Sequence, residues 1–275
     1  MMQELPEARA TGELAVIYEE LRTTCAVPYV SSLQRQLATM PGCLEYAWAL
    51  LRPAFVSGLL PETAWRLASM MPVAPLPPLT PGALRLLGVD AAGMQAIRNI
   101  CDNFVRVAPI NLLFAGAVER VLEGAEATGE VAAVAWSPPE PLAPMPAMVD
   151  LEQADADLRS VLLGLGTEIG GAAFIPGLYR LLARWPGYLA HVAALLTPLL
   201  RSEMARAERA AIASNIMVAA GEILAAVLPT ERPPPSAAQA QAIRGAIHTY
   251  RVSSSEMIVF GTLLRDALPP EGEEA

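Results

Sequence analysis

The sequence predicts an all-α fold made of two tandem helical repeats that form an intramolecular pseudo-dimer, and three observations lead to this prediction. Hydrophobic residues make up 53% of the 275 residues, and most of them are Ala and Leu, which favour helices. Aromatic residues make up only 5%, and no window shows the sustained alternation of Val, Ile and Thr that is typical of strands. Finally, one stretch of the chain occurs twice.

The repeated stretch covers residues 29–53 and, at an offset of 145 residues, residues 174–198. The matching pairs include Leu33 with Leu178, Arg35 with Arg180, Leu37 with Leu182, Pro41 with Pro186, Gly42 with Gly187, and Pro53 with Pro198. Similarity at a long fixed offset indicates that one helical unit has been duplicated. A site on the pseudo-twofold axis of such a pair takes residues from both halves.

Apolar residues at helical spacing predict the helices of the first repeat. These helices cover residues 11–21, 29–40, 43–51, a segment that begins after Pro61, 92–105 and 111–122. Pro41 and Gly42 end the second of them, and Pro109 predicts a break between the last two. The proline-rich stretch 72–81 predicts an extended connector, because it cannot form a regular helix.

The second repeat is expected to retrace the first. Its predicted helices cover residues 151–165, 174–185, 188–196, 207–228, 238–250 and 256–268. The proline-rich run 131–148 predicts a semi-rigid linker between the halves. We therefore divide the chain into a first helical repeat over residues 1–127, a linker over 128–150 and a second helical repeat over 151–275, which together form one integrated domain.

The charged residues exclude several classes of function. The net charge is −9 and the isoelectric point is near 4.8, so a nucleic-acid role has little electrostatic support. All 19 basic residues are Arg. Without a Lys amine the chain cannot be a Schiff-base enzyme, a pyridoxal-phosphate enzyme or a P-loop nucleotidase.

Cysteine and histidine are too sparse to indicate a metal site, a disulfide framework or a thiol peroxidase. The chain has Cys25, Cys43, Cys101, His191 and His248, without a Cys-x-x-Cys or His-x-x-x-His spacing. We expect no metal, no cofactor and a cytoplasmic, reducing location, since the sequence shows no signal peptide.

The most apolar segment, residues 210–228, contains Ser214, Asn215 and Glu222. These polar residues favour a buried helix over a membrane span, because they are costly to bury in lipid. We therefore predict that the protein does not insert into a membrane.

Three stretches, residues 17–22, 27–30 and 35–48, resemble the group I, DL-type 2-haloacid dehalogenases, and the resemblance extends over both repeats. It implies an all-α pseudo-dimer with an active site between the repeats and without a cofactor or metal. In that family water attacks C2 of a 2-haloalkanoate directly, displaces halide and accepts both enantiomers. An aspartate of the second repeat is the general base, and an asparagine of the first helps to hold the water.

The chain departs from this family at the base, because Leu178 stands where the aspartate is expected, just before Tyr179. Asn103 is one candidate for the water-holding asparagine, although a second alignment places Ala108 at that position. We nominate Asn103 and Tyr179 as catalytic residues that position water, with the base unidentified. The carboxylates considered as a replacement base are those of Asp102, Glu62, Glu168, Glu208 and Glu222.

Four further residues are candidates for binding the substrate: Ser31, Ser32, Trp48 and Leu178. Ser31 and Ser32 precede the first signature helix, where their side chains serve either a bound carboxylate or the helix cap. An aromatic such as Trp48 at helical spacing is more often a core residue than part of a pocket.

Two functions fit the sequence. The first is a cofactor-independent hydrolase of a small (halo)carboxylic acid in a pocket between the repeats. The second is a non-catalytic small-molecule-binding protein on the same fold, since Leu178 makes the centre of the site apolar and favours an apolar ligand. The oligomeric state is open, and a homodimer is included among the expected partners.

Overall fold

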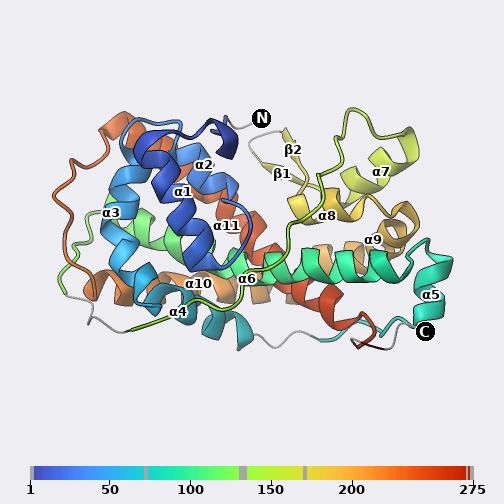
Figure 1. Ribbon diagram of the computed structural model, residues 1–275. Helices are drawn as coiled ribbons and strands as arrows, with labels where there is room; N and C mark the ends of the chain where they lie inside the picture. The colour runs from blue at the N-terminus through green and yellow to red at the C-terminus, as the bar shows by residue number, and fades with distance from the viewer. Residues whose placement is uncertain (1–2, 71–73, 130–134, 170–171, 271, 273–275) are drawn as a thin grey trace. The chain divides into compact units, whose positions relative to one another are not determined.

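The computed structural model describes residues 3–70, 74–129, 135–169, 172–270 and 272 of the chain. Helices dominate these ranges, which confirms the predicted all-α class (Figure 1). The α-helices are α1 (Gly12–Cys25), α2 (Ser32–Leu37), α3 (Cys43–Val56), α4 (Leu59–Ser69), α5 (Pro81–Leu86), α6 (Ala91–Leu122), α7 (Ala156–Leu165), α8 (Gly177–Leu182), α9 (Pro186–Arg201), α10 (Glu203–Ala225) and α11 (Ala237–Asp266).

Two short elements supplement the α-helices. Residues Glu7–Arg9 form a 3-10 helix, η1. The strands β1 (Thr167–Ile169) and β2 (Ala172–Phe174) form an antiparallel hairpin in which Thr167 pairs with Phe174. The hairpin connects α7 to α8, a connection for which the sequence predicted no regular structure.

The chain divides into two compact units, each assembled from three separate segments. Unit one comprises Met1–Met71, Arg106–Pro144 and Ala211–Ser255, and unit two comprises Pro72–Val105, Met145–Ala210 and Glu256–Ala275. The helices α6, α10 and α11 contribute residues to both units. This division follows packing density and does not test the boundaries of the repeats, which stay a prediction.

The core of unit one forms where α1 packs on α3 and α3 packs on α4. The ring of Phe55 lies 5.0 Å from that of Trp48 and 6.3 Å from that of Phe114, which are separations typical of aromatic pairs. Trp48 is buried, and its indole N–H donates to Glu20 at 2.8 Å. Trp48 is therefore a core residue whose polar edge is satisfied at the surface of the unit.

In unit two, α7 and α8 both pack against α9. Two glycines show how closely α8 and α11 approach α6. A Cβ atom added at Gly177 of α8 would lie 3.4 Å from the ring of Phe104 in α6, and one added at Gly261 of α11 would lie 3.8 Å from Phe104 Cβ. The segments of α6, α8 and α11 around these residues are therefore neighbours, and this arrangement positions the site described below.

The predicted break at Pro109 is wrong, because α6 continues through this proline. Proline removes one backbone hydrogen bond and tilts neighbouring carbonyl groups outward. The carbonyl of Arg106, in the preceding turn, accepts a hydrogen bond from Trp65 Nε1 at 2.9 Å. The residues that follow Pro109 are buried, and their packing favours a continuous helix over a break.

The predicted break between residues 250 and 256 is also wrong, because α11 is continuous there. The hydroxyl of Ser253 donates to the carbonyls of Thr249 and Tyr250, and that of Ser255 donates to the carbonyl of Arg251. Serine hydroxyls that bond one turn back in this way satisfy their polarity inside a helix.

The other differences concern element lengths. The signature helices are shorter than predicted, since α2 and α8 cover only Ser32–Leu37 and Gly177–Leu182. The helix α5 was missed at the end of the proline-rich connector. Thr80 caps it by accepting a hydrogen bond from Ala83 N at 3.2 Å, and Pro81 occupies its first turn, where proline is favoured.

The secondary structure repeats with the offset seen in the sequence. Helix α8 begins and ends 145 residues after α2, and α9 ends 145 residues after α3. This regularity supports the duplication, and the pseudo-dimer stays a prediction.

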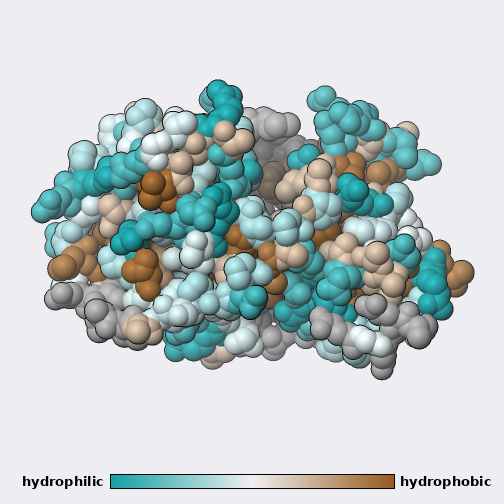
Figure 2. All heavy atoms as spheres, viewed as in Figure 1, coloured by the Kyte–Doolittle hydropathy of each residue, from teal (hydrophilic) through white to brown (hydrophobic). Residues whose placement is uncertain are grey.

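Hydrophobic residues on the face shown in Figure 2 form small separate groups among polar ones. The exposed large apolar side chains include Val16 of α1, Leu86 of α5 and Val218 of α10. Among the helices within the described ranges, none combines the length and the apolar character that crossing a bilayer requires.

Candidate functional site

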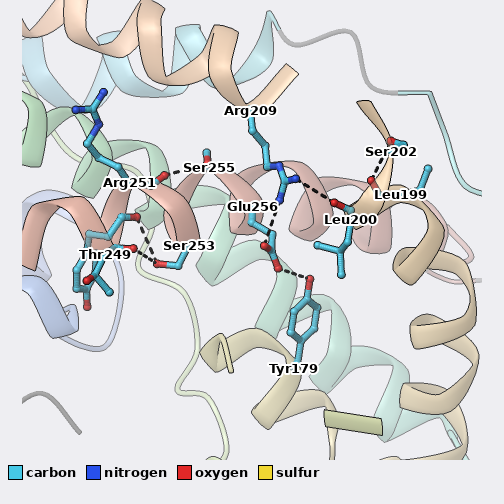
Figure 3. Close-up of polar contacts among 11 residues, drawn as sticks. Tyr179, Leu199, Leu200, Ser202, Arg209, Thr249, Arg251, Ser253, Ser255 and Glu256 are labelled. Carbon is cyan, nitrogen blue, oxygen red and sulfur yellow. Dashed lines mark hydrogen bonds and ion pairs between the residues drawn. The ribbon is translucent and has the colours of Figure 1, made fainter. Parts of the chain in front are cut away.

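A buried pair of side chains joins α8 to α11 in unit two (Figure 3). The hydroxyl of Tyr179 donates to Glu256 Oε1 at 2.9 Å. Tyr179 is 0% exposed and Glu256 is 2% exposed. Burial of an ionised carboxylate is costly unless the group is hydrogen-bonded and paired, so this pair requires an explanation.

Burial raises the pKa of Glu256 from its ordinary value of 4.5 to about 7, although the Tyr179 hydroxyl and the Arg209 charge lower it in part. Burial beside the same carboxylate raises the pKa of Tyr179 well above its ordinary value. Tyr179 therefore remains protonated and acts as a donor, while Glu256 changes its charge close to neutral pH.

Arg209 of α10 is the cationic member of this cluster. Its Nη1 lies 3.5 Å from Glu256 Oε2, and its Nη2 donates to the carbonyl of Leu200 at 3.1 Å. Leu200 lies in the last turn of α9, where carbonyl groups lack partners within the helix. The end of α9 thus fixes the orientation of the guanidinium group, as Figure 3 shows.

This arrangement has the properties of a general base. A base is most effective when its pKa lies near the working pH, and the pKa of Glu256 is about 7. Tyr179 holds one carboxylate oxygen in place, and Arg209 stabilises the ionised form. The cluster has the components needed to accept a proton from water.

Tyr179, which the sequence nominated for positioning water, belongs to this cluster, and the sequence did not nominate Glu256. One signal was available, because the polar run from Ser253 to Glu256 directly precedes the buried apolar run from Met257 to Phe260. Leu178, at the position of the expected aspartate, is fully buried in the core of unit two. Asn103 is also buried in this unit, and its amide donates to the carbonyl of Asn99 at 2.8 Å in the same helix.

Unit one contains a second buried polar chain. Gln34 Nε2 donates to Asn111 Oδ1 at 2.8 Å, and Asn111 Nδ2 donates to Ser31 Oγ. Ser31 precedes α2 in the N-cap position, but its side chain makes no capping hydrogen bond and contacts Asn111 instead. The next residue, Ser32, accepts a hydrogen bond from Arg35 at 3.1 Å.

The two buried pairs occupy equivalent positions of the predicted repeats. Gln34 and Asn111 are 77 residues apart, and so are Tyr179 and Glu256. Each residue of the second pair lies 145 residues after its counterpart in the first. The first pair consists of neutral amides, so only the second pair provides an ionisable carboxylate.

The carboxylates nominated from the sequence lie in other environments. Glu62 and Glu222 are exposed, Glu208 is half-buried, and the side chain of Glu168 lies outside the described part of the structure. Asp102 is half-buried and lies 3.9 Å from Arg265. Glu62 accepts a hydrogen bond from the indole of Trp136 at 2.8 Å.

The cysteines are unsuited to nucleophilic chemistry. Burial raises the pKa of Cys25 and of Cys101 to about 12, so both thiols stay protonated. Within the ranges that the structure describes, no three His, Cys, Asp or Glu side chains come together in a way that would hold a metal ion.

Comparisons with known proteins point to one group of enzymes. Over 212 residues the chain is 28% identical to a configuration-inverting 2-haloacid dehalogenase of Alcaligenes xylosoxydans xylosoxydans, which covers 73% of this chain and 70% of the relative. It is 26% identical over 228 residues to an (R)-2-haloacid dehalogenase of Pseudomonas putida, with 80% and 75% covered. Both of these relatives are 2-haloacid dehalogenases. No protein-family model matches the chain.

Two solved structures that resemble this one are also dehalogenases. A D-2-haloacid dehalogenase mutant matches with a TM-score of 0.74 and 23% identity, covering 97% of this chain and 96% of that one. A D-2-haloacid dehalogenase in complex with L-LA matches with a TM-score of 0.73 and 22% identity, with the same coverage. The chain therefore shares the fold of these D-2-haloacid dehalogenases over nearly its whole length.

Proposed function

We propose that the protein hydrolyses the carbon–halogen bond at C2 of a small 2-halocarboxylic acid, with Glu256 as the general base. The observation that carries the proposal is the buried Glu256 carboxylate, held by Tyr179 and with a pKa of about 7, in a chain whose relatives are 2-haloacid dehalogenases. The carboxylate lies in the same compact unit as Leu178, the position at which the family has its aspartate.

The proposed reaction is a single displacement by water. Glu256 takes one proton from the water molecule, the water oxygen forms a bond to C2, and the electron pair of the carbon–halogen bond leaves with the halide. The product is a 2-hydroxy acid with the opposite configuration at C2. Inversion is what the name of the Alcaligenes relative describes, and the step needs no cofactor or metal.

Three other residues have roles in this proposal. Tyr179 holds the carboxylate through its hydroxyl, and Asn103 positions the water, as the resemblance implies. Leu178, which is fully buried in the same unit, would provide an apolar wall to the site. The chain would thus have moved the base from α8 to α11 and kept it beside the signature tyrosine.

A second candidate function is non-catalytic binding of a small molecule. Leu178 favours it, because this residue is 0% exposed and replaces the carboxylate on which the chemistry of the family depends. In that case the contacts of Glu256 with Tyr179 and Arg209 stabilise the unit and have no part in a reaction.

Halide release from (R)- and (S)-2-chloropropionate tests the proposal. We expect activity in the native protein and a loss of roughly 10²- to 10⁴-fold in Glu256→Gln, which keeps the shape and loses the basic group. The matched control is Glu203→Gln, which changes an exposed glutamate of α10.

The other outcomes are equally informative. Equal activity in the native protein and in Glu256→Gln would show that another group is the base. If only a Leu178→Asp variant releases halide, the native chain has the scaffold without a base, and non-catalytic binding is the better description. If neither the native protein nor Leu178→Asp releases halide, the site has diverged from that of the relatives.

A further inference from the structure

We propose that Arg209 binds the carboxylate group of the substrate beside Glu256. The inference rests on the function proposed above and identifies the residue that binds the carboxylate of its substrate. It also makes Arg209 the residue that distinguishes an acid from its neutral amide. Three features of the Arg209 side chain support this role.

The first feature is accessibility. The side chain of Arg209 is 18% exposed, whereas that of Glu256 is 3% exposed. The Arg209 side chain is therefore more accessible to solvent than the Glu256 carboxylate. Because the whole chain carries a net charge of −9, an anionic substrate is repelled at long range and needs a local cation.

The second feature is the length of the ion pair. The 3.5 Å contact between Arg209 Nη1 and Glu256 Oε2 is longer than the roughly 2.7–2.9 Å of a strong charge-assisted hydrogen bond. A substrate carboxylate that lies roughly 2.7–2.9 Å from the guanidinium group would interact with it more strongly than Glu256 does. The planar fork of arginine suits a carboxylate, which it binds through two parallel hydrogen bonds.

The third feature is orientation. The carbonyl of Leu200 accepts a hydrogen bond from Arg209 Nη2 at 3.1 Å, which keeps the guanidinium group beside Glu256. A carboxylate bound there would have its C2 atom close to the base. The same contact thus provides both affinity and placement of the reacting carbon.

Binding at Arg209 has a consequence for Glu256. The groups that lower the pKa of Glu256 are Tyr179 from α8 and Arg209 from α10, and burial opposes both. A bound anion neutralises the Arg209 charge, so it raises the pKa of Glu256. Substrate binding near neutral pH is then accompanied by uptake of protons. The acid limb of the kcat profile, which reports the enzyme–substrate complex, therefore lies at a higher pH than the acid limb of the kcat/KM profile, which reports the free enzyme.

Calorimetric binding of propionate tests the proposal, since this probe lacks a halogen and is not turned over. In two buffers of different ionisation enthalpy near neutral pH, the native protein should bind propionate with fractional uptake of a proton. Arg209→Gln should weaken propionate binding about 10- to 100-fold, as expected for the loss of a charged hydrogen-bond partner, and leave propionamide binding unchanged. Arg209→Lys should keep part of the affinity.

Two controls separate binding from folding and from catalysis. Arg206→Gln removes an exposed arginine one turn away on α10 and should bind propionate as the native protein does. Glu256→Gln should bind propionate without uptake of a proton. Because propionate does not react, these results stand even if the native protein releases no halide, so failure of the function and failure of this inference are distinguishable.

Several results would overturn the inference. The native protein could fail to bind propionate, or Arg209→Gln could bind propionate as tightly as the native protein does. Arg209→Gln could also lose affinity for propionate and for propionamide to the same extent. The native measurement also decides the case if Arg209→Gln does not fold, since propionate binding without proton uptake contradicts a bound anion beside Glu256.

Discussion

Replacement of Glu256 with Gln should remove a term that makes the native protein less stable as the pH rises. Glu256 has a pKa of about 7 in the folded protein, compared with an ordinary value of 4.5. A group whose pKa is raised by folding stabilises the folded protein fully at pH values below its pKa in the unfolded chain. This stabilisation is lost as the pH rises through its pKa in the folded protein. The pH window of this loss therefore extends from about 4.5 to somewhat above 7.

The size of the term follows from the two pKa values. One pKa unit corresponds to about 1.4 kcal/mol, so the difference between about 7 and 4.5 amounts to roughly 3 kcal/mol over the whole window. The glutamine amide still accepts the hydrogen bond from Tyr179 and does not ionise. The free energy of unfolding of the native protein should thus fall relative to that of Glu256→Gln as the pH increases.

Urea unfolding at a series of pH values measures this difference. The isoelectric point near 4.8 sets a lower limit, because proteins tend to precipitate where their net charge approaches zero. Between about pH 5.5 and pH 8, about 2 kcal/mol of the difference should appear. The comparison uses the native protein and the variant under identical conditions, so all other titrating groups cancel.

A flat difference across this range would refute the reasoning. It would mean that Glu256 has an ordinary pKa in the folded protein, so that its burial is compensated by stronger pairing than the contacts with Tyr179 and Arg209 supply. A difference of the opposite sign would mean that the Arg209 ion pair dominates. Either result would also weaken the proposed role of Glu256 as a base near neutral pH.

Two further predictions concern packing and buried amides. Gly58→Ala should destabilise the protein by roughly 1–3 kcal/mol more than Gly88→Ala, as measured by urea unfolding. Both glycines have φ near +80°, so the backbone strain is similar, but only a Cβ atom at Gly58 meets the ring of Trp136, at 2.5 Å. Equal losses would mean that the indole moves aside freely. Asn111→Ala should lower the free energy of unfolding by roughly 1–3 kcal/mol for each buried polar group that it leaves without a partner. In a double-mutant cycle, adding Gln34→Leu to this variant should restore part of that free energy. Additive losses would contradict the coupling.

Much of the fold follows from local sequence signals. The all-α class and the approximate positions of most helices result from apolar residues at helical spacing. The breaks expected at Pro109 and in the serine run near Ser253 did not occur, since the residues after Pro109 are buried in unit one and the serine hydroxyls bond to carbonyls one turn back. Such compensation depends on the packing of the helices, and a proline or a serine by itself does not reveal it.

Less of the candidate site could be predicted from the sequence. Resemblance to a family led us to nominate Leu178 and Tyr179 as site positions. The carboxylates considered as a base, such as Glu62 and Asp102, are exposed or half-buried in the structure. Glu256 lies 77 residues from Tyr179, and periodicity alone does not indicate that two helices bring them together. The offset that relates Glu256 to Asn111 was a usable signal, but it had no chemical meaning before the buried contact of each was known.

The sequence by itself determined the helical class, the duplicated stretch with its Pro-Gly turns, and the absence of Lys with the enzyme classes that this excludes. Each of these depends on residue identity and spacing along the chain, which do not change on folding. Only the tertiary structure decided which carboxylate is buried, which side chains contact it and where its pKa lies. A pKa is set by burial and by neighbouring charges, and these come from segments as distant as α8, α10 and α11.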